Sequence, residues 1–130
     1  MPHMVMAHEV NPKEKLLGEI GDISDFKLYN NQILCAVYIR PTKTKSGLYL
    51  ADSTVDEDRN QSKVGLVVKM GPDAFVDSTN QWFKGVKIGV EDWAVFRPSD
   101  GWSITVNNVL CRILDDTNVR GQIPHPDMVW

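Results

Sequence analysis

The sequence has no long apolar run. No stretch of about 18 apolar residues, the shortest expected of a membrane-spanning helix, occurs in the chain of 130 residues. The first part of the chain also lacks the apolar segment that is typical of a secretory signal peptide. We therefore expect no membrane partner, and a protein that acts in the cytoplasm or is assembled from it.

Cysteine is scarce, and no metal-ligand spacing is present. Cys35 and Cys111 both lie in apolar, strand-like runs, where buried and reduced thiols are the usual state of a cytoplasmic protein. His3 and His8 lie near the N-terminus without a third ligand close by in the sequence. We expect no metal and no cofactor.

The charge is small, with a net value of −3 at pH 7. Nucleic-acid-binding domains usually carry a broad basic face, which this composition does not favour. The one basic cluster, Arg40, Lys43 and Lys45, is interpreted as the solvated base of a loop. We expect no nucleic acid among the partners.

Catalytic patterns are also missing. Residues 56–58 and the pair Asp115 and Asp116 are acidic, but no histidine, lysine or apolar pocket can be predicted beside them, so they are interpreted as solvated charges. The chain has no glycine-rich phosphate loop and no serine in the setting of a nucleophile elbow. The sequence therefore predicts a protein that is not an enzyme.

Residues 1–29 are interpreted as an N-terminal arm that contains one short helix. Asn11 is a typical N-cap, Pro12 suits the first helical position, and Gly21 is expected to end the helix. A helix this short needs a surface to lie on. Its apolar face consists of Leu16, Leu17 and Ile20.

Residues 30–123 read as a small all-β domain. Strand-like runs bounded by Gly, Pro, Asn and Asp lie at 33–39, 64–70, 86–88, 93–96, 103–106 and 109–114. Both faces of the first run are apolar, so we expect it to be covered on both sides. Residues 107–108 are expected to form a tight turn, and 75–85 a hairpin or flap. Many short strands with closely spaced turns predict a closed β-barrel.

A long polar loop, residues 42–62, separates the first two runs and carries three apolar side chains. Each of these gains roughly 1.5 to 3 kcal/mol when it is buried completely. Such a loop cannot bury them itself, so a groove on another protein is the expected destination. The predicted partner-binding residues are Ser46, Gly47, Leu48, Tyr49 and Leu50.

Residues 124–130 are expected to form a stiff, extended C-terminal tail, because Pro124 and Pro126 restrict its backbone. Trp130 is unfavourable to leave in water, so we expect the tail to dock on another surface. The predicted subunit or assembly contacts are Leu16, Leu17, Ile20, Leu34, Tyr38, Ile123 and Trp130.

Five segments, in order, resemble one known family. They are 31–37, 45–50, 63–72, 86–89 with 92–96, and 109–113 with 118–123. They are similar to the first strand, mobile loop, Gly-Pro turn strand, Gly-Asp signature and closing strands of the GroES-type co-chaperonins, the ten-kilodalton ring partners of the chaperonin. The resemblance implies a GroES-like β-barrel subunit that forms rings, pairs its terminal strands with neighbours, and grips a larger partner with its loop.

The chain departs from the family pattern in several places. The double glycine before the apolar tripeptide is Ser46-Gly47 here, which stiffens the loop. Val90 and Glu91 look inserted before Asp92. The arm and the tail extend beyond the part that resembles the family.

Two functions are compatible with these residues. The first, drawn from the extensions, is a structural protein of a phage, since stand-alone members of this family also occur in phage genomes. It would decorate or cement the virion head (capsid shell) through its arm, loop and tail. The alternative is a phage or bacterial co-chaperonin that caps a GroEL-type chaperonin through Leu48-Tyr49-Leu50. Both predict a homo-oligomer within a larger protein assembly.

Overall fold

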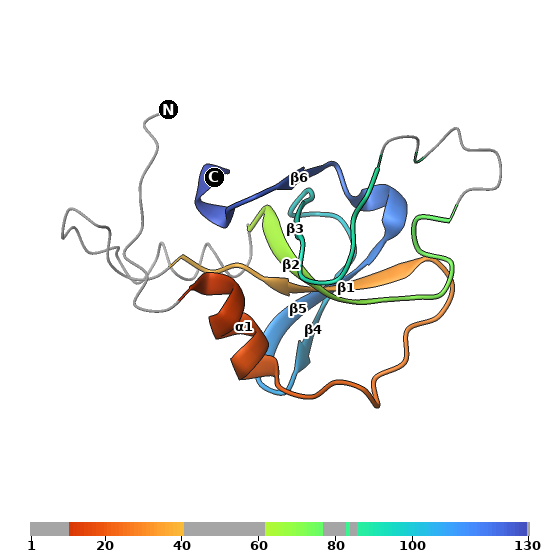
Figure 1. Cartoon of the computed structure of the whole chain (residues 1–130). Helices are drawn as coiled ribbons and strands as arrows, with labels where there is room; N and C mark the ends of the chain where they lie inside the picture. The colour runs from red at the N-terminus through yellow and green to blue at the C-terminus, as the bar shows by residue number, and fades with distance from the viewer. Residues whose placement is uncertain (1–10, 41–61, 77–82, 84–85, 130) are drawn as a thin grey trace.

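The computed structural model describes residues 11–40, 62–76, 83 and 86–129 (Figure 1). Within them, one α-helix precedes six β-strands, and two short 3₁₀ helices follow β5 and β6. The elements are α1 (Pro12–Ile20), β1 (Gln32–Val37), β2 (Val64–Met70), β3 (Trp93–Val95), β4 (Trp102–Val106), β5 (Val109–Asp115), η1 (Asp116–Asn118), β6 (Gly121–Ile123) and η2 (Pro126–Met128). The predicted all-β class with one short N-terminal helix is confirmed.

The six strands form one antiparallel sheet in the order β4-β5-β1-β2-β3-β6. β1 lies inside the sheet, so its backbone is paired on both sides. Ala36, for example, lies opposite Cys111 on β5 and Leu66 on β2. In the described part of the chain, β4 and β6 are the outer strands of this ladder.

Both faces of the central strands are covered, and all of β1 after Gln32 is buried. One face carries the helix-side core, which includes Leu34, Ala36, Tyr38, Val64, Leu66 and Trp93. The other face carries a second core that includes Ile33, Cys35, Val67, Ala94, Phe96 and Leu114. Side chains alternate along a strand, so one strand contributes to both cores. The predicted two-sided burial of the first strand is confirmed.

Helix α1 has the predicted boundaries. The Asn11 Oδ1 accepts a hydrogen bond from the backbone N–H of Lys13 at 2.9 Å, which satisfies one of the free donors of the first turn. Gly21 ends the helix with a φ of 63°, a conformation that glycine adopts without steric cost. The predicted apolar face meets the sheet: Ile20 belongs to the helix-side core, and Leu16 and Leu17 pack against it.

The arm is further attached to the sheet by polar contacts. The Lys69 Nζ on β2 donates a hydrogen bond to the carbonyl oxygen of Ile23 at 2.8 Å. Asn107 and Asn108 form the predicted turn between β4 and β5 with φ values of 49° and 66°, which suit a type I′ turn. The Asn107 side chain donates to the Ile20 carbonyl oxygen at 2.7 Å. The end of α1 is therefore fixed to the β4–β5 turn.

The predicted strand at residues 86–88 is wrong. These residues have no regular secondary structure, and the Val86 side chain is exposed. β3, which follows in the chain, already pairs with β2 on one side and β6 on the other, so 86–88 cannot pair with it. Most of the predicted 75–85 hairpin lies outside the described residues.

The predicted extended tail is more compact than expected. η2 turns the chain directly after His125, whose Nδ1 accepts a hydrogen bond from the backbone N–H of Asp127 at 3.2 Å. Pro126 is fully buried and Val129 packs against the helix-side core. The tail is therefore docked on its own subunit, although Trp130 lies outside the described residues.

Candidate functional site

The predicted partner-binding residues, 46–50, lie outside the described residues, as do His3 and His8. The structure does describe the two points at which the loop leaves the sheet, residues 38–40 and 62–64. We call these two segments the loop base. Its geometry decides where the loop starts.

Ser62 connects the two sides of the loop base. Its hydroxyl donates a hydrogen bond to the Tyr38 carbonyl oxygen at 2.8 Å, and the Tyr38 N–H donates to the Val64 carbonyl oxygen at 3.0 Å. Ser62 is only 2 % exposed. These bonds extend the pairing of β1 and β2 to the place where the loop begins.

Tyr38 connects the loop base to two other elements. Its ring packs edge-on against Trp93 of β3, with ring centroids 5.7 Å apart at an angle of 76°. Its hydroxyl donates a hydrogen bond to the Asp127 Oδ1 at 2.5 Å. The C-terminal tail therefore reaches the loop base.

Arg40 corrects one prediction. It was expected at the solvated base of the loop, yet the residue is only 8 % exposed. A guanidinium stays charged and is stable in such a place only when protein groups replace its water. Arg40 is accordingly part of the packed loop base, whereas Lys43 and Lys45 lie outside the described residues.

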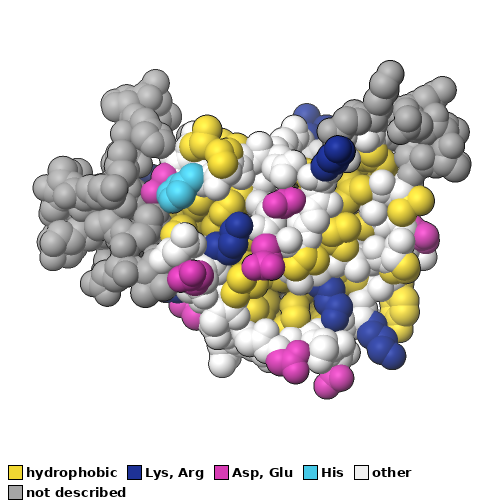
Figure 2. Space-filling view, viewed as in Figure 1, with side chains coloured by type: hydrophobic (Ala, Val, Ile, Leu, Met, Phe, Trp, Pro, Cys, Tyr) yellow, Lys and Arg dark blue, Asp and Glu magenta, His cyan; other side chains and the backbone are white. Residues whose placement is uncertain are grey.

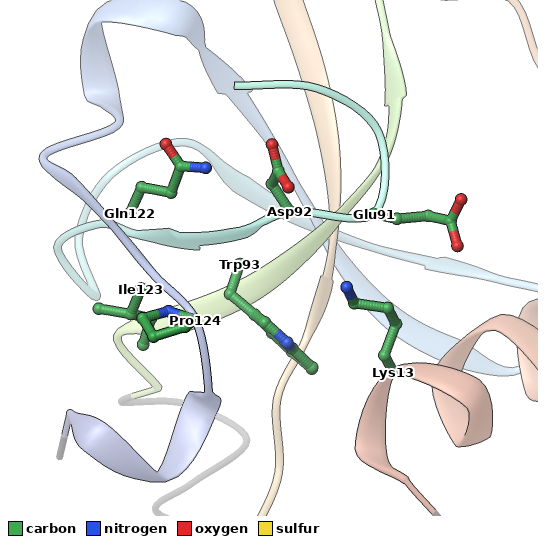
Figure 3. A pocket seen from close by; sticks show the side chains of 7 residues that line it. All are labelled: Lys13, Glu91, Asp92, Trp93, Gln122, Ile123 and Pro124. Atoms are coloured by element: carbon green, nitrogen blue, oxygen red, sulfur yellow. The ribbon is translucent and has the colours of Figure 1, made fainter. Parts of the chain in front are cut away.

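A pocket of about 330 Å³ lies beside β6. Figure 3 shows the Lys13 side chain reaching from α1 towards the segment that carries Glu91 and Asp92. Trp93 lies between Lys13 and Pro124 in this view. Asp92 is already engaged, since its Oδ2 accepts the Gly89 N–H at 2.8 Å. The lining is Lys13, Glu91, Asp92, Trp93, Gln122, Ile123 and Pro124. Among the described residues that line the pocket, none is a nucleophile with a neighbouring base.

Val90 and Glu91, which precede β3, form a turn beside β2. Glu91 has a φ of 77°, and its N–H donates to the Val67 carbonyl oxygen at 2.6 Å. The Val67 N–H in turn donates to the Asp92 carbonyl oxygen at 2.9 Å. Val90 at the tip is 51 % exposed. These bonds fix the turn to β2 beside the pocket, directly before β3.

Asp116 is also not the solvated charge that the sequence suggested. It is 4 % exposed, and its carboxylate accepts hydrogen bonds from the Asn31 Nδ2 at 3.0 Å and from the Phe75 N–H at 2.9 Å. Asp115 is exposed, as expected, and the Gln32 side chain donates to it. Asp116 joins three segments that are distant in the sequence, which is a structural role.

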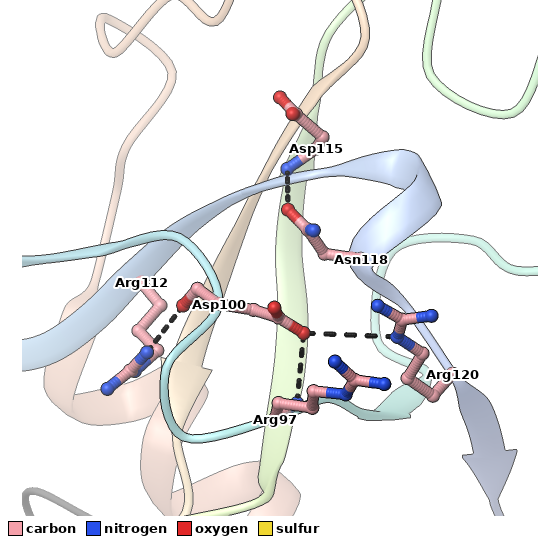
Figure 4. Close-up of polar contacts among 6 residues, drawn as sticks. All are labelled: Arg97, Asp100, Arg112, Asp115, Asn118 and Arg120. Atoms are coloured by element: carbon pink, nitrogen blue, oxygen red, sulfur yellow. Dashed lines mark hydrogen bonds and ion pairs between the residues drawn. The ribbon is translucent and has the colours of Figure 1, made fainter.

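A cluster of arginines surrounds Asp100 (Figure 4). Arg112 donates to the Asp100 carbonyl oxygen at 2.5 Å, and its guanidinium lies 5.8 Å from the centre of the Phe96 ring. Burial lowers the pKa of Arg112, and the nearby Asp100 carboxylate opposes this effect. The Arg97 N–H and the exposed Arg120 side chain approach the Asp100 Oδ2 at 3.2 and 3.9 Å. The cluster holds the turn that precedes β4 against strand β5.

The cysteines are buried and free, as predicted. Burial raises the pKa of Cys111 to about 11 and raises that of Cys35 as well. Thiols that stay protonated are poor nucleophiles and poor metal ligands. Among the described residues, no group of three or more potential metal-binding side chains gathers, and no helix there is long and apolar enough to cross a membrane.

The surface in Figure 2 carries acidic, basic and apolar side chains interspersed, without a field of one sign on the described part of this face. Of the predicted assembly contacts, Leu34, Tyr38 and Ile20 are at most 2 % exposed. They pack inside their own subunit, because the arm covers this face of the sheet. They are therefore core residues here, and a neighbour could reach them only after rearrangement.

The other predicted assembly contacts are more accessible. Leu16, Leu17 and Ile123 are partly buried against the helix-side core, so a role for them in assembly stays a prediction. Ile123 lies on β6, which pairs with β3 on one side and is an outer strand of the described ladder. Trp130 lies outside the described residues.

The chain is similar to one known protein family over most of its length. The model of the chaperonin 10 Kd subunit family matches residues 25–123, whereas no curated protein matches the sequence. The matched range contains the six described strands and the loop between β1 and β2, and it leaves out α1 and the tail. Members of this family are non-enzymatic cofactors of chaperonins, in agreement with the prediction that the protein is not an enzyme. Since well over half of the chain is matched, the protein belongs to the chaperonin 10 kDa subunit family, that of the GroES-type co-chaperonins.

Proposed function

We propose that this protein is a co-chaperonin that forms a ring and caps a GroEL-type chaperonin through Leu48, Tyr49 and Leu50. The observation that carries the proposal is the family match over residues 25–123, which includes this loop. Apolar side chains gain free energy when they leave water for a partner's groove. The proposed site of action is the cytoplasm.

The loop base supports this function physically. Ser62, Tyr38 and Val64 are joined by hydrogen bonds, so the loop starts from a fixed place on the sheet. A segment that becomes ordered only on binding loses conformational entropy, which limits affinity and permits release. A rigid base restricts that loss to the loop itself.

The outer edge of β6, as far as the described residues go, supports assembly into a ring. An outer strand presents backbone donors and acceptors that a strand of another chain can pair with. β6 pairs with β3 through residues 121–123, and it is an outer strand in the part of the chain that the structure describes. We infer that a terminal strand of a neighbouring subunit pairs with this side of β6.

The expected capsid role receives no support from the comparisons, and neither does a phage origin. The capsid hypothesis rested on the arm and the tail as attachments to other proteins. In the structure, α1 and residues 124–129 pack on the subunit's own sheet. Ile20, Pro126 and Val129 thus already pack within the subunit, which favours the co-chaperonin.

The test is a double substitution in the loop. Leu48→Ala with Leu50→Ala should weaken binding to a purified bacterial GroEL-type chaperonin in the presence of ATP by at least about 100-fold, since each buried leucine contributes roughly 1.5 to 3 kcal/mol. The melting temperature of the subunit should not change. Calorimetry measures the affinity and circular dichroism the melting.

The matched control is Val90→Ala, which shortens an exposed apolar side chain outside the loop. It should bind the chaperonin as the unmodified protein does. A wild-type protein without measurable affinity for the chaperonin would contradict the proposed function.

A further inference from the structure

The C-terminal tail lies beyond the part of the chain that matches the family and has an ordered place of its own. The family match ends at residue 123, and the chain continues through η2. Pro126 of η2 is fully buried, and Val129 packs against the helix-side core. Pro126 and Val129, which both lie beyond the family match, thus hold residues 124–129 against the sheet.

The tail makes a polar contact with the loop base. The Tyr38 hydroxyl donates to the Asp127 Oδ1 at 2.5 Å, and the Asp127 side chain is only 6 % exposed. A hydrogen bond to a carboxylate is stronger than one between neutral groups. His125 holds the Asp127 backbone in place through the hydrogen bond at its Nδ1. The carboxylate is therefore oriented towards Tyr38 from within the tail.

Tyr38 connects the tail to both sides of the loop base. Its backbone bonds to Val64 and Ser62 on the β2 side, and two residues later the buried Arg40 precedes the loop. The tail, β1 and β2 thus meet at one residue. Tyr38 is therefore the residue that connects Asp127 to the point from which the loop departs.

Packing alone does not explain an acidic residue at position 127. Burying a carboxylate is unfavourable unless hydrogen bonds compensate for the lost water. An apolar side chain would cover the same surface without that cost. An aspartate that faces a tyrosine hydroxyl instead gives a directional contact, which fixes an angle as well as a distance.

We propose that residues 124–129 are a positioning element for the partner-binding loop, and that Asp127, acting through Tyr38, sets the direction in which the loop leaves the sheet. This rests on the proposed function, since the loop is taken to bind the chaperonin. Fixing the base in advance reduces the ordering that binding must supply. The tail thereby raises affinity for the chaperonin without contacting it.

The test compares Tyr38→Phe and Asp127→Ala with the wild type. Tyr38→Phe keeps the ring against Trp93 and removes only the hydroxyl. Both variants should bind the GroEL-type chaperonin about three- to tenfold more weakly, the effect expected for the loss of one hydrogen bond. Asp127→Asn, which keeps an oxygen that can accept from Tyr38, should recover most of the affinity. Calorimetry should show the loss as a less favourable entropy of binding.

Two controls separate positioning from general stability. Ile104 lies on β4, at the opposite end of the sheet order from β6, and packs against the helix-side core. Ile104→Ala removes this packing and should lower the melting temperature without lowering affinity for the chaperonin. Hydrogen exchange of the Tyr38 and Val64 amides provides a measurement without the chaperonin. Asp127→Ala should accelerate exchange at these amides, and Ile104→Ala should not accelerate it there selectively.

The outcomes distinguish this inference from the function on which it rests. If the wild type binds and all tail variants bind equally well, the positioning role is refuted while the co-chaperonin function stands. If the wild type does not bind, the co-chaperonin function fails. Unchanged exchange at the loop base in Asp127→Ala would refute the positioning role in either case.

Discussion

At the scale of single residues, the neighbouring backbone restricts position 71 to glycine. A Cβ at Gly71, which follows β2, would lie 2.4 Å from the Asn30 carbonyl oxygen and 3.0 Å from that of Tyr29. Gly71 also donates its N–H to the Gln32 carbonyl oxygen at 2.7 Å. The start of β1 and the end of β2 approach so closely here that only glycine fits between them.

Gly71→Ala should therefore destabilise the fold by about 1 to 3 kcal/mol, the usual cost of overpacking. The matched control is Gly18→Ala in α1, where a Cβ would meet nothing within 4 Å. It should stabilise the protein by roughly 0.5 to 1 kcal/mol, since alanine favours a helix over glycine. Urea denaturation measures both values, and equal effects of the two substitutions would contradict this explanation.

At the scale of elements, α1 packs on one face of the sheet and is not a free arm. Ile20 is 2 % exposed and belongs to the helix-side core, and the end of the helix is bonded to Asn107. An isolated helix of nine residues is unstable in water, so packing must supply most of its stability. α1 should therefore melt together with the sheet.

Ile20→Ala should lower the free energy of unfolding by about 2 to 4 kcal/mol, because it leaves a cavity between α1 and the sheet. Glu19→Ala, at an exposed position on the same helix, should change it by less than about 0.5 kcal/mol. Unfolding followed by circular dichroism and by tryptophan fluorescence should give one common transition. Separate transitions for the helix and the sheet would show that α1 is independent.

At the scale of the whole molecule, the two buried thiols link stability to pH. Burial raises the pKa of Cys111 from its ordinary value of 9.0 to about 11, and that of Cys35 also rises. Above pH 9.0 the unfolded chain releases thiol protons that the folded chain retains. The folded state then binds more protons than the unfolded state, so the free energy of unfolding falls as pH rises.

The wild type should therefore lose stability between about pH 9 and pH 11 relative to a variant with both cysteines replaced by alanine. Other groups titrate in this range, but they are common to both proteins, so the difference isolates the thiols. Urea denaturation at several pH values measures it. A pH-independent difference would indicate that the thiols are accessible to water in the folded state.

The sequence by itself determined the elements whose causes are local. Helix α1, the turn at Asn107 and Asn108, and strands β1 and β2 follow from caps, backbone preferences and alternating apolar residues, which neighbouring residues reveal. The order of five motifs also identified the family. The apolar loop was recognised as the candidate contact from its composition alone.

Only the tertiary structure decided which polar residues are buried and what they join. Asp116 bonds to Asn31 across 85 positions, and Asp127 bonds to Tyr38 across 89. The strand expected at 86–88 is absent because β3 takes its partners from elsewhere in the chain. Contacts between segments so distant in sequence depend on how the whole sheet curls and packs, and no local pattern records them.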